Sequence, residues 1–116
     1  MNAKEVYMAY DEALALRIRA ALPDLPGLTE KKMFGGIAFL VHGNMACGVS
    51  GENLMVRIRP DATDAALAQP AVRVFDMTGR PMKGWVLVEP AGLQSTDQLM
   101  HWVEQGVAFA QSLPPK

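Results

Sequence analysis

The feature that most constrains the fold is a series of short apolar segments separated by very short turns, between Lys31 and Arg59. Turns of two or three residues leave no room for a crossover connection, so neighbouring segments have to pair as antiparallel strands. The pattern predicts strands at 31–34, 37–42, 45–50 and 54–59, with hairpin turns at Gly43-Asn44 and at 51–53. The centre of the chain is therefore expected to be an antiparallel β meander.

The fourth predicted strand, 54–59, alternates between two kinds of side chain. Its even positions are all aliphatic, and its odd positions hold Met55, Arg57 and Arg59. Successive side chains point to opposite faces of a sheet, so this alternation predicts one buried face and one wet face. Met55 is then expected on the wet face beside Arg57.

Segments with helical spacing flank the predicted meander. They lie at 10–22, at 61–68 and from Ser95 to about Ser112, and two further strands are expected at 72–75 and 84–89. Ser95 and Gln98 have the spacing of a capping box at the start of the last helix. We expect an α+β fold in two layers, an antiparallel sheet with helices on one face, in the order α-β-β-β-β-α-β-β-α.

Length and composition bound the class of protein. The 116 residues fit a single domain over 1–116, with 1–7 and 113–116 as flexible tails. Half of the residues are hydrophobic, and the net charge is −1 with a pI near 6.1, which argues against a dedicated nucleic-acid binder. Cys47 is the single cysteine, no segment has the pattern of a signal peptide, and no apolar run reaches the length of a membrane span. The expected location is the cytoplasm.

Known catalytic patterns are absent from the sequence. Gly35-Gly36 is not followed by the helix and lysine of a phosphate-binding loop, so we expect these glycines to bend a strand. There is no HExxH motif, no paired-cysteine motif and no nucleophile elbow around a serine. We expect neither an enzyme nor a bound cofactor.

Cys47 and His42 form one candidate site. With a turn at Gly43-Asn44, His42 and Cys47 become diagonal neighbours on one face, about 7 Å apart at Cα. A thiol beside an imidazole can act as a nucleophile or as half of a metal site, although His101 is the only other histidine. The alternative, which we favour, is a buried thiol that packs as a small apolar group beside an exposed histidine.

A second candidate is an interaction surface on the sheet. It comprises Met55, Arg57, Arg59, Arg73 and Trp85, with Arg80, Lys83, Lys31 and Lys32 as further basic residues. Trp85 has the strand parity of a partly exposed side chain, and exposed tryptophan and arginine are common anchors of protein interfaces. The arginines could also contact phosphates, which keeps direct nucleic-acid binding open as an alternative.

Several segments, taken in order, resemble a known family. They are Met33-Phe34-Gly35-Gly36-Ile37-Ala38-Phe39, then Gly43-Asn44-Met45, Leu54-Met55-Val56-Arg57, the stretch from Gly79 to Pro90, and the helix from Leu99 to Ala110. This series resembles the N-terminal domain of the TfoX/Sxy competence regulators over roughly residues 8 to 112. Met33, Phe34, Gly35 and Gly36 are the family-like structural motif.

The resemblance implies a compact α+β domain with a bacterial regulatory role. Full-length members promote competence genes together with the cyclic-AMP receptor protein, and they carry a second, helical domain. We expect this chain to be a stand-alone member that acts as a non-enzymatic regulatory or protein-interaction domain. Its expected partner is a transcription regulator or a second copy of itself in a homodimer, with no membrane. The alternatives are nucleic-acid binding through a basic sheet face and a thiol or metal site at Cys47 and His42.

Overall fold

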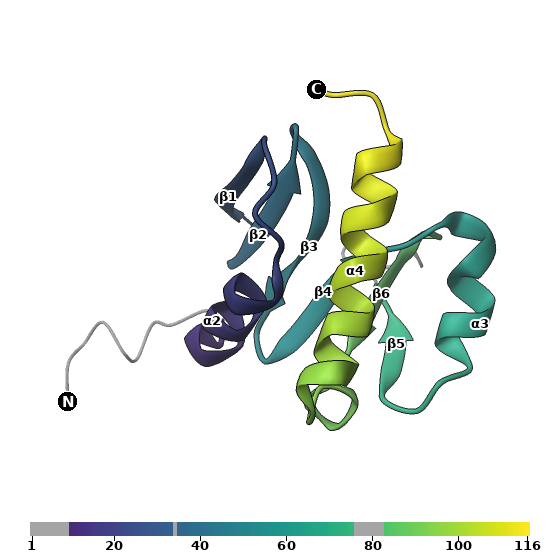
Figure 1. Ribbon diagram of the computed structural model, residues 1–116. Helices are drawn as coiled ribbons and strands as arrows, with labels where there is room; N and C mark the ends of the chain where they lie inside the picture. Colours follow the sequence, from purple (N-terminus) through teal and green to yellow (C-terminus); the bar gives the residue numbers. More distant parts are fainter. Residues whose placement is uncertain (1–9, 34, 76–82) are drawn as a thin grey trace, which may run out of the picture.

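A six-stranded antiparallel sheet forms the frame of the molecule, in the strand order β1-β2-β3-β4-β6-β5 (Figure 1). This is a computed structural model, and it describes residues 10–33, 35–75 and 83–116. The strands are β1 (Leu28–Met33), β2 (Gly36–Val41), β3 (Asn44–Ser50), β4 (Asn53–Arg57), β5 (Val72–Val74) and β6 (Trp85–Val88). The helices are α2 (Glu12–Ala21), α3 (Thr63–Leu67) and α4 (Thr96–Ser112), with 3-10 turns η1 (Pro60–Ala62) and η2 (Pro90–Gly92). The predicted α+β class and order of elements are confirmed.

The helices α2 and α4 lie over the same face of the sheet, and α3 lies beside β5 and β6 (Figure 1). The stripe predicted for α4 is buried against this face, at Leu99, Trp102, Val103, Gly106 and Ala110. The predicted capping box is also present, with Ser95 and Gln98 bonding each other's backbone N–H groups. No helix among the described residues is long and apolar enough to cross a membrane.

Gly106 sets how closely α4 approaches the sheet. A Cβ atom at this position would collide with the carbonyl oxygen of Ala46. Ala46 lies where the β2–β3 register shifts, since Phe39 pairs with Cys47 whereas Leu40 pairs with Met45. The bulge therefore presents a backbone carbonyl to the helix, and only glycine lets the two backbones come this close.

The glycine motif makes the first bend of the meander, as predicted. Met33 pairs with Gly36 across the β1–β2 turn, and Gly35 has a φ of +73°. A side chain at Gly36 would overlap the carbonyl oxygen of Val49, so this strand passes the backbone of β3 closely. Phe34 and Arg80 of the predicted sites lie outside the described residues, as do the tail 1–7 and most of the loop before β6.

The second turn differs from the prediction by one residue. The two turn residues are His42 and Gly43, with φ angles of +49° and +84°, whereas Asn44 pairs with Val41 as the first residue of β3. A two-residue turn of this hand needs positive φ at both central positions, and histidine tolerates it better than most side chains. Asn44 is instead buried, and its amide donates a hydrogen bond of 2.9 Å to the carbonyl of Pro114.

The start of the first strand also differs from the prediction, and the C-terminal segment makes hydrogen bonds to the β2–β3 turn. The first strand begins at Leu28 rather than Lys31, since its backbone pairs with β2 from Leu28 onward. The sequence did not indicate these extra residues, because most side chains of the strand are exposed and show no apolar alternation. The segment 113–116, expected to be a flexible tail, is held against the β2–β3 turn. The backbone N–H of Lys116 donates to the carbonyl of His42 at 2.8 Å, next to the Asn44 bond.

Candidate functional site

Arg57, the last residue of β4, lies between aromatic rings from two different elements. Its guanidinium carbon is 5.5 Å from the ring centre of Trp85 on β6 and 5.1 Å from that of Phe109 on α4. Phe75 extends the row, with its ring centre 5.7 Å from that of Trp85. We call Phe109, Arg57, Trp85 and Phe75 the arginine–aromatic stack. Each contact is within the range of a cation–π or aromatic pair.

The sheet itself creates the place for this stack. Pairing between β3 and β4 ends at Cys47 and Val56, so Arg57 has a strand neighbour only on the β6 side, where it is paired with Trp85. Phe109 comes from α4 to the guanidinium of Arg57 at this end of the strand. Arg57 and Trp85 are both half-buried, as expected for side chains whose flat surfaces are covered and whose edges stay in water.

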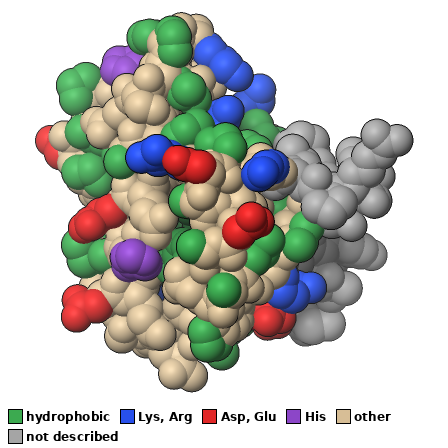
Figure 2. All heavy atoms as spheres, turned by 90° about the vertical axis from the view of Figure 1, so that its right-hand side faces the viewer, with side chains coloured by type: hydrophobic (Ala, Val, Ile, Leu, Met, Phe, Trp, Pro, Cys, Tyr) green, Lys and Arg blue, Asp and Glu red, His purple; other side chains and the backbone are tan. Residues whose placement is uncertain are grey.

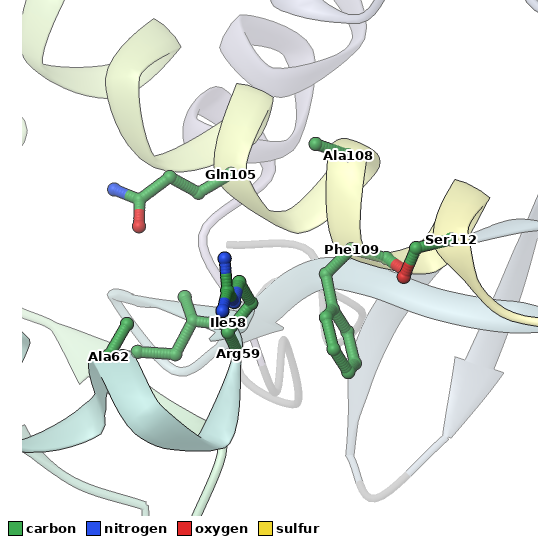
Figure 3. Close-up of a pocket in the computed structure, with 7 residues that line it drawn as sticks. All are labelled: Ile58, Arg59, Ala62, Gln105, Ala108, Phe109 and Ser112. Atoms are coloured by element: carbon green, nitrogen blue, oxygen red, sulfur yellow. The ribbon is translucent and has the colours of Figure 1, made fainter.

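A groove of about 230 Å³ opens beside the stack, between α4 and the chain leaving β4 (Figure 3). One wall comes from α4, and the other from the end of β4 and from η1. The lining residues are Ile58, Arg59, Ala62, Gln105, Ala108, Phe109 and Ser112. The groove is mainly apolar, and Phe109 belongs both to it and to the arginine–aromatic stack. We call this site the Phe109 groove.

The basic residues of the predicted surface do not form a continuous patch. Arg59 pairs with Asp61 at 2.8 Å and Arg73 pairs with Glu89 at 3.1 Å. Arg57 makes no ion pair with any carboxylate of the described residues. On the side that carries α3, acidic and basic side chains are interspersed (Figure 2). The structure thus brings Arg57 and Trp85 together, whereas Arg59 and Arg73 are each neutralised by a carboxylate nearby.

The other basic candidates lie away from the groove or do not line it. Lys31 and Lys32 are exposed on β1, which forms the edge of the sheet opposite to β5. Lys83 is exposed just before β6 and is not among the residues that line the Phe109 groove. None of these three residues extends the arginine–aromatic stack.

The expectation that Met55 is exposed is wrong, because only 2% of its surface is accessible. It pairs with Gly48 on one side and with Leu87 on the other. Gly48 leaves room for the methionine, since a Cβ there would be 2.7 Å from the Met55 Cε atom. Met55 fills space above a glycine in the middle of the sheet and is not part of an interaction surface.

The diagonal pairing of His42 with Cys47 is also wrong. The turn falls at His42 itself, so Phe39, rather than Leu40 as expected, lies opposite Cys47. The thiol is fully buried, and this burial raises its pKa to about 12, so it stays protonated and unreactive. His42 is exposed in the turn, and His101 is exposed on α4 beside Gln105. Over the described ranges, no three His, Cys, Asp or Glu side chains gather to hold a metal ion.

Sequence reasoning missed Phe109 and Phe75. Phe109 follows Gly106 by three residues and therefore lies at the margin of the buried stripe of α4. An aromatic residue at the margin of such a stripe, next to the exposed Ala108, is the signal that could have found it. Phe75 continues the parity of Arg73 beyond β5, which places it on the same face as Trp85.

Comparison with known proteins agrees with the architecture and with the resemblance of the sequence. No curated protein matches the chain. The family model described as the TfoX N-terminal domain matches residues 20–110, which include all the strands and helices described here except residues 12–19 of α2 and residues 111–112 of α4. The chain therefore belongs to the TfoX N-terminal domain family.

Proposed function

We propose that this protein is a non-catalytic regulatory domain that acts on transcription by docking a segment of a protein partner in the Phe109 groove. The proposal places the domain in the cytoplasm, where bacterial transcription takes place. Membership of the TfoX N-terminal domain family supports a link to regulation. The residues of the site support the second part of the proposal, the docking of a partner segment.

The observation that carries the proposal is the size and chemistry of the groove. Its volume of about 230 Å³ is below the range of about 300–1,000 Å³ typical of small-molecule pockets. Among the residues that the structure describes, its polar lining consists of Arg59, Gln105 and Ser112, with no carboxylate, imidazole or thiol. General acid–base chemistry depends on such groups. An apolar groove lined by phenylalanine and arginine, next to the arginine–aromatic stack, has instead the composition of a protein interface.

The proposed partner is a transcription regulator, and a second copy of this chain is the alternative. Light scattering of the purified protein separates the two, because self-docking gives a mass that rises with concentration. A monomer at all concentrations leaves a different protein as the partner.

The test uses two matched substitutions of exposed helix alanines. Ala108→Trp fills the Phe109 groove with a large ring, and Ala13→Trp places the same ring on α2, away from the groove. Transcripts are compared between the host bacterium, a strain lacking the gene, and strains complemented with the wild type or with each variant. We expect the wild type and Ala13→Trp to restore the transcripts that the deletion changes, and Ala108→Trp to fail.

Two results would reject the proposal in different ways. Unchanged transcripts in the deletion strain would reject a regulatory role. Full restoration by Ala108→Trp, at protein levels equal to the wild type, would reject the groove as the docking surface.

A further inference from the structure

The Phe109 groove and the arginine–aromatic stack are two parts of one surface. Phe109 lines the groove (Figure 3). The centre of its ring is also 5.1 Å from the guanidinium carbon of Arg57. Arg59, two residues after Arg57 in the chain, lines the opposite wall of the groove. A ligand in the groove therefore lies between apolar walls, against Arg59 and against the aromatic residue that packs on Arg57.

The dimensions limit what this surface can hold. The α4 wall runs from Gln105 to Ser112, about 10 Å along the helix axis. An extended chain covers about 3.3 Å per residue, so this wall faces about three residues of a bound segment. A volume of about 230 Å³ leaves room for one large apolar side chain and a few water molecules, at about 30 Å³ per water. A short linear segment fits this space, and a folded domain does not enter it.

The charges beside the groove favour a bound segment with negative charge. Arg57 has no carboxylate partner among the described residues, and its cation is held by the rings of Trp85 and Phe109. The Arg59–Asp61 pair is open to solvent, with side-chain exposures of 73% and 70%. Such exposed pairs contribute little, so Arg59 can exchange Asp61 for a carboxylate of a partner. Acidic residues on the segment gain favourable contacts here, and basic residues are repelled.

We propose that the Phe109 groove binds a short acidic segment of a partner protein that carries one large apolar side chain between its carboxylates. The apolar side chain enters the groove between Ile58, Ala62 and Phe109, and the flanking carboxylates pair with Arg57 and Arg59. This inference rests on the proposed docking function and adds the chemistry of the partner.

A single-stranded nucleic acid is the competing occupant, because bases can stack on aromatic side chains beside arginines. Two observations favour the acidic segment. Asp61 lies beside Arg59 and Glu89 lies beside Arg73, so the basic residues do not form the continuous track that follows a nucleic-acid backbone, whereas a short acidic segment needs only two arginines. The walls of the groove are mostly aliphatic, and Phe109 is the one aromatic residue among the described lining residues, which suits a leucine-like side chain better than a base.

The test is a titration of the full, isotope-labelled chain followed by NMR. The probes are four capped heptapeptides that differ only in their central three residues, Asp-Leu-Asp, Asn-Leu-Asn, Lys-Leu-Lys and Asp-Ala-Asp, and a fifth probe is a ten-nucleotide thymidine strand. The reporters are the Nε–H of Arg57, the side-chain amide of Gln105 and the methyl group of Ala108. We expect the Asp-Leu-Asp probe to shift all three and to bind about tenfold more tightly than the Lys-Leu-Lys and Asp-Ala-Asp probes.

Charge substitutions at one exposed position provide the control. Ala108→Glu adds a carboxylate to the groove wall and Ala108→Lys adds a cation of similar length. We expect Asp-Leu-Asp to bind about tenfold more weakly to the glutamate variant than to the lysine variant, and the order to reverse for Lys-Leu-Lys. Both substitutions are exposed, so each variant is expected to fold.

The outcomes separate this inference from the proposed function. Equal binding of the acidic and basic leucine peptides at the groove would overturn the proposed preference for acidic segments and leave the docking function standing. Shifts confined to other parts of the protein, or tighter binding of the thymidine strand than of any peptide, would overturn the proposed occupant. Unchanged transcripts in the deletion strain would reject the regulatory role whatever the peptides do, and full restoration by Ala108→Trp would reject the groove as the docking surface.

Discussion

The helix α4 has two long flanks that meet the rest of the molecule in different ways. The flank over the sheet, with Trp102, Gly106 and Ala110, is buried to within a few per cent. The neighbouring flank, with Gln105, Ala108 and Phe109, borders the Phe109 groove. The two flanks share one backbone and one capping box, and they differ in what lies opposite to them.

The difference comes from the strands beneath the helix. Under the buried flank, the Ala46 carbonyl and the Val56 side chain fill the space beside Gly106. Beyond Val56 the pairing ends, and the chain turns away through η1. The helix then faces a gap that Phe109 fills only in part. The groove is thus a consequence of where the pairing of β3 with β4 stops. The tightly packed flank of α4 holds the flank that borders the groove in place.

Trp102→Ala is the strongest test of this contrast. Trp102 is 4% exposed within the core, so its loss is expected to lower the free energy of unfolding by about 4 kcal/mol. Phe109→Ala on the groove flank removes a half-buried ring, and we expect a loss of about 2 kcal/mol. Urea unfolding followed by circular dichroism measures both. Equal losses for the two variants would show that the groove flank is packed as tightly as the core.

Gly106→Val tests the closeness of the helix to the sheet. Its side chain would meet the carbonyl of Ala46, so α4 has to move outward, and we expect a loss of about 3 kcal/mol in the free energy of unfolding. Ala108→Val puts the same side chain two residues away on the groove flank, where we expect a change within about 0.5 kcal/mol. A mild effect at Gly106 in the same urea experiment would contradict the close approach of the two backbones.

Local patterns predicted one flank of α4 and missed the other. The buried stripe and the capping box depend on spacings within the helix, and the meander depends on turns of two or three residues. The groove instead depends on where β3 and β4 separate and on how far Phe109 reaches toward Arg57. These relations join residues that are distant in sequence, and no periodicity within a segment records them.

The incorrect predictions for Met55 and for the β2–β3 turn also come from contacts between residues on different strands. The burial of Met55 depends on Gly48, a residue of the neighbouring strand that offers no side chain of its own. The shift of the turn to His42 goes with the bulge at Ala46, which adds one residue to β3. Alternation predicts which face a residue points to, but the neighbouring strands decide whether that face is wet.

The Ser95→Ala variant tests whether both flanks of α4 depend on the same N-terminal cap. The Ser95 side chain accepts a hydrogen bond of 3.1 Å from the backbone of Gln98, and its loss is expected to cost about 1 kcal/mol in the free energy of unfolding. Thr96→Ala, at the next exposed position, is the control and is expected to stay near the wild type. Faster amide hydrogen exchange should be confined to the first turn of α4. Exchange that rises only along the groove flank would mean that this flank has a separate stability.

The smallest expected effect comes from the exposed ion pair that joins α2 to β1. Arg19 on α2 donates two hydrogen bonds, of 2.7 and 2.8 Å, to Glu30 on β1, and the hydrogen bond from Arg19 lowers the pKa of Glu30 below its ordinary 4.5. A carboxyl group that is more acidic in the folded state stabilises the protein above its unfolded pKa. That contribution is lost as the pH falls through the lower, folded pKa.

Glu30→Gln should therefore lower the free energy of unfolding by less than about 1 kcal/mol at neutral pH, and the difference from the wild type should shrink as the pH falls below the ordinary glutamate pKa of 4.5. Glu104→Gln, on an exposed residue of α4 without an ion pair among the described residues, is the control. The result bears on the groove, because the Arg59–Asp61 pair is more exposed than the Arg19–Glu30 pair. A loss well above about 1 kcal/mol at Glu30 would mean that exposed pairs in this protein hold their arginines firmly. Arg59 would then not be free to exchange Asp61 for a partner's carboxylate, and Arg57 alone would select the charge of the bound segment.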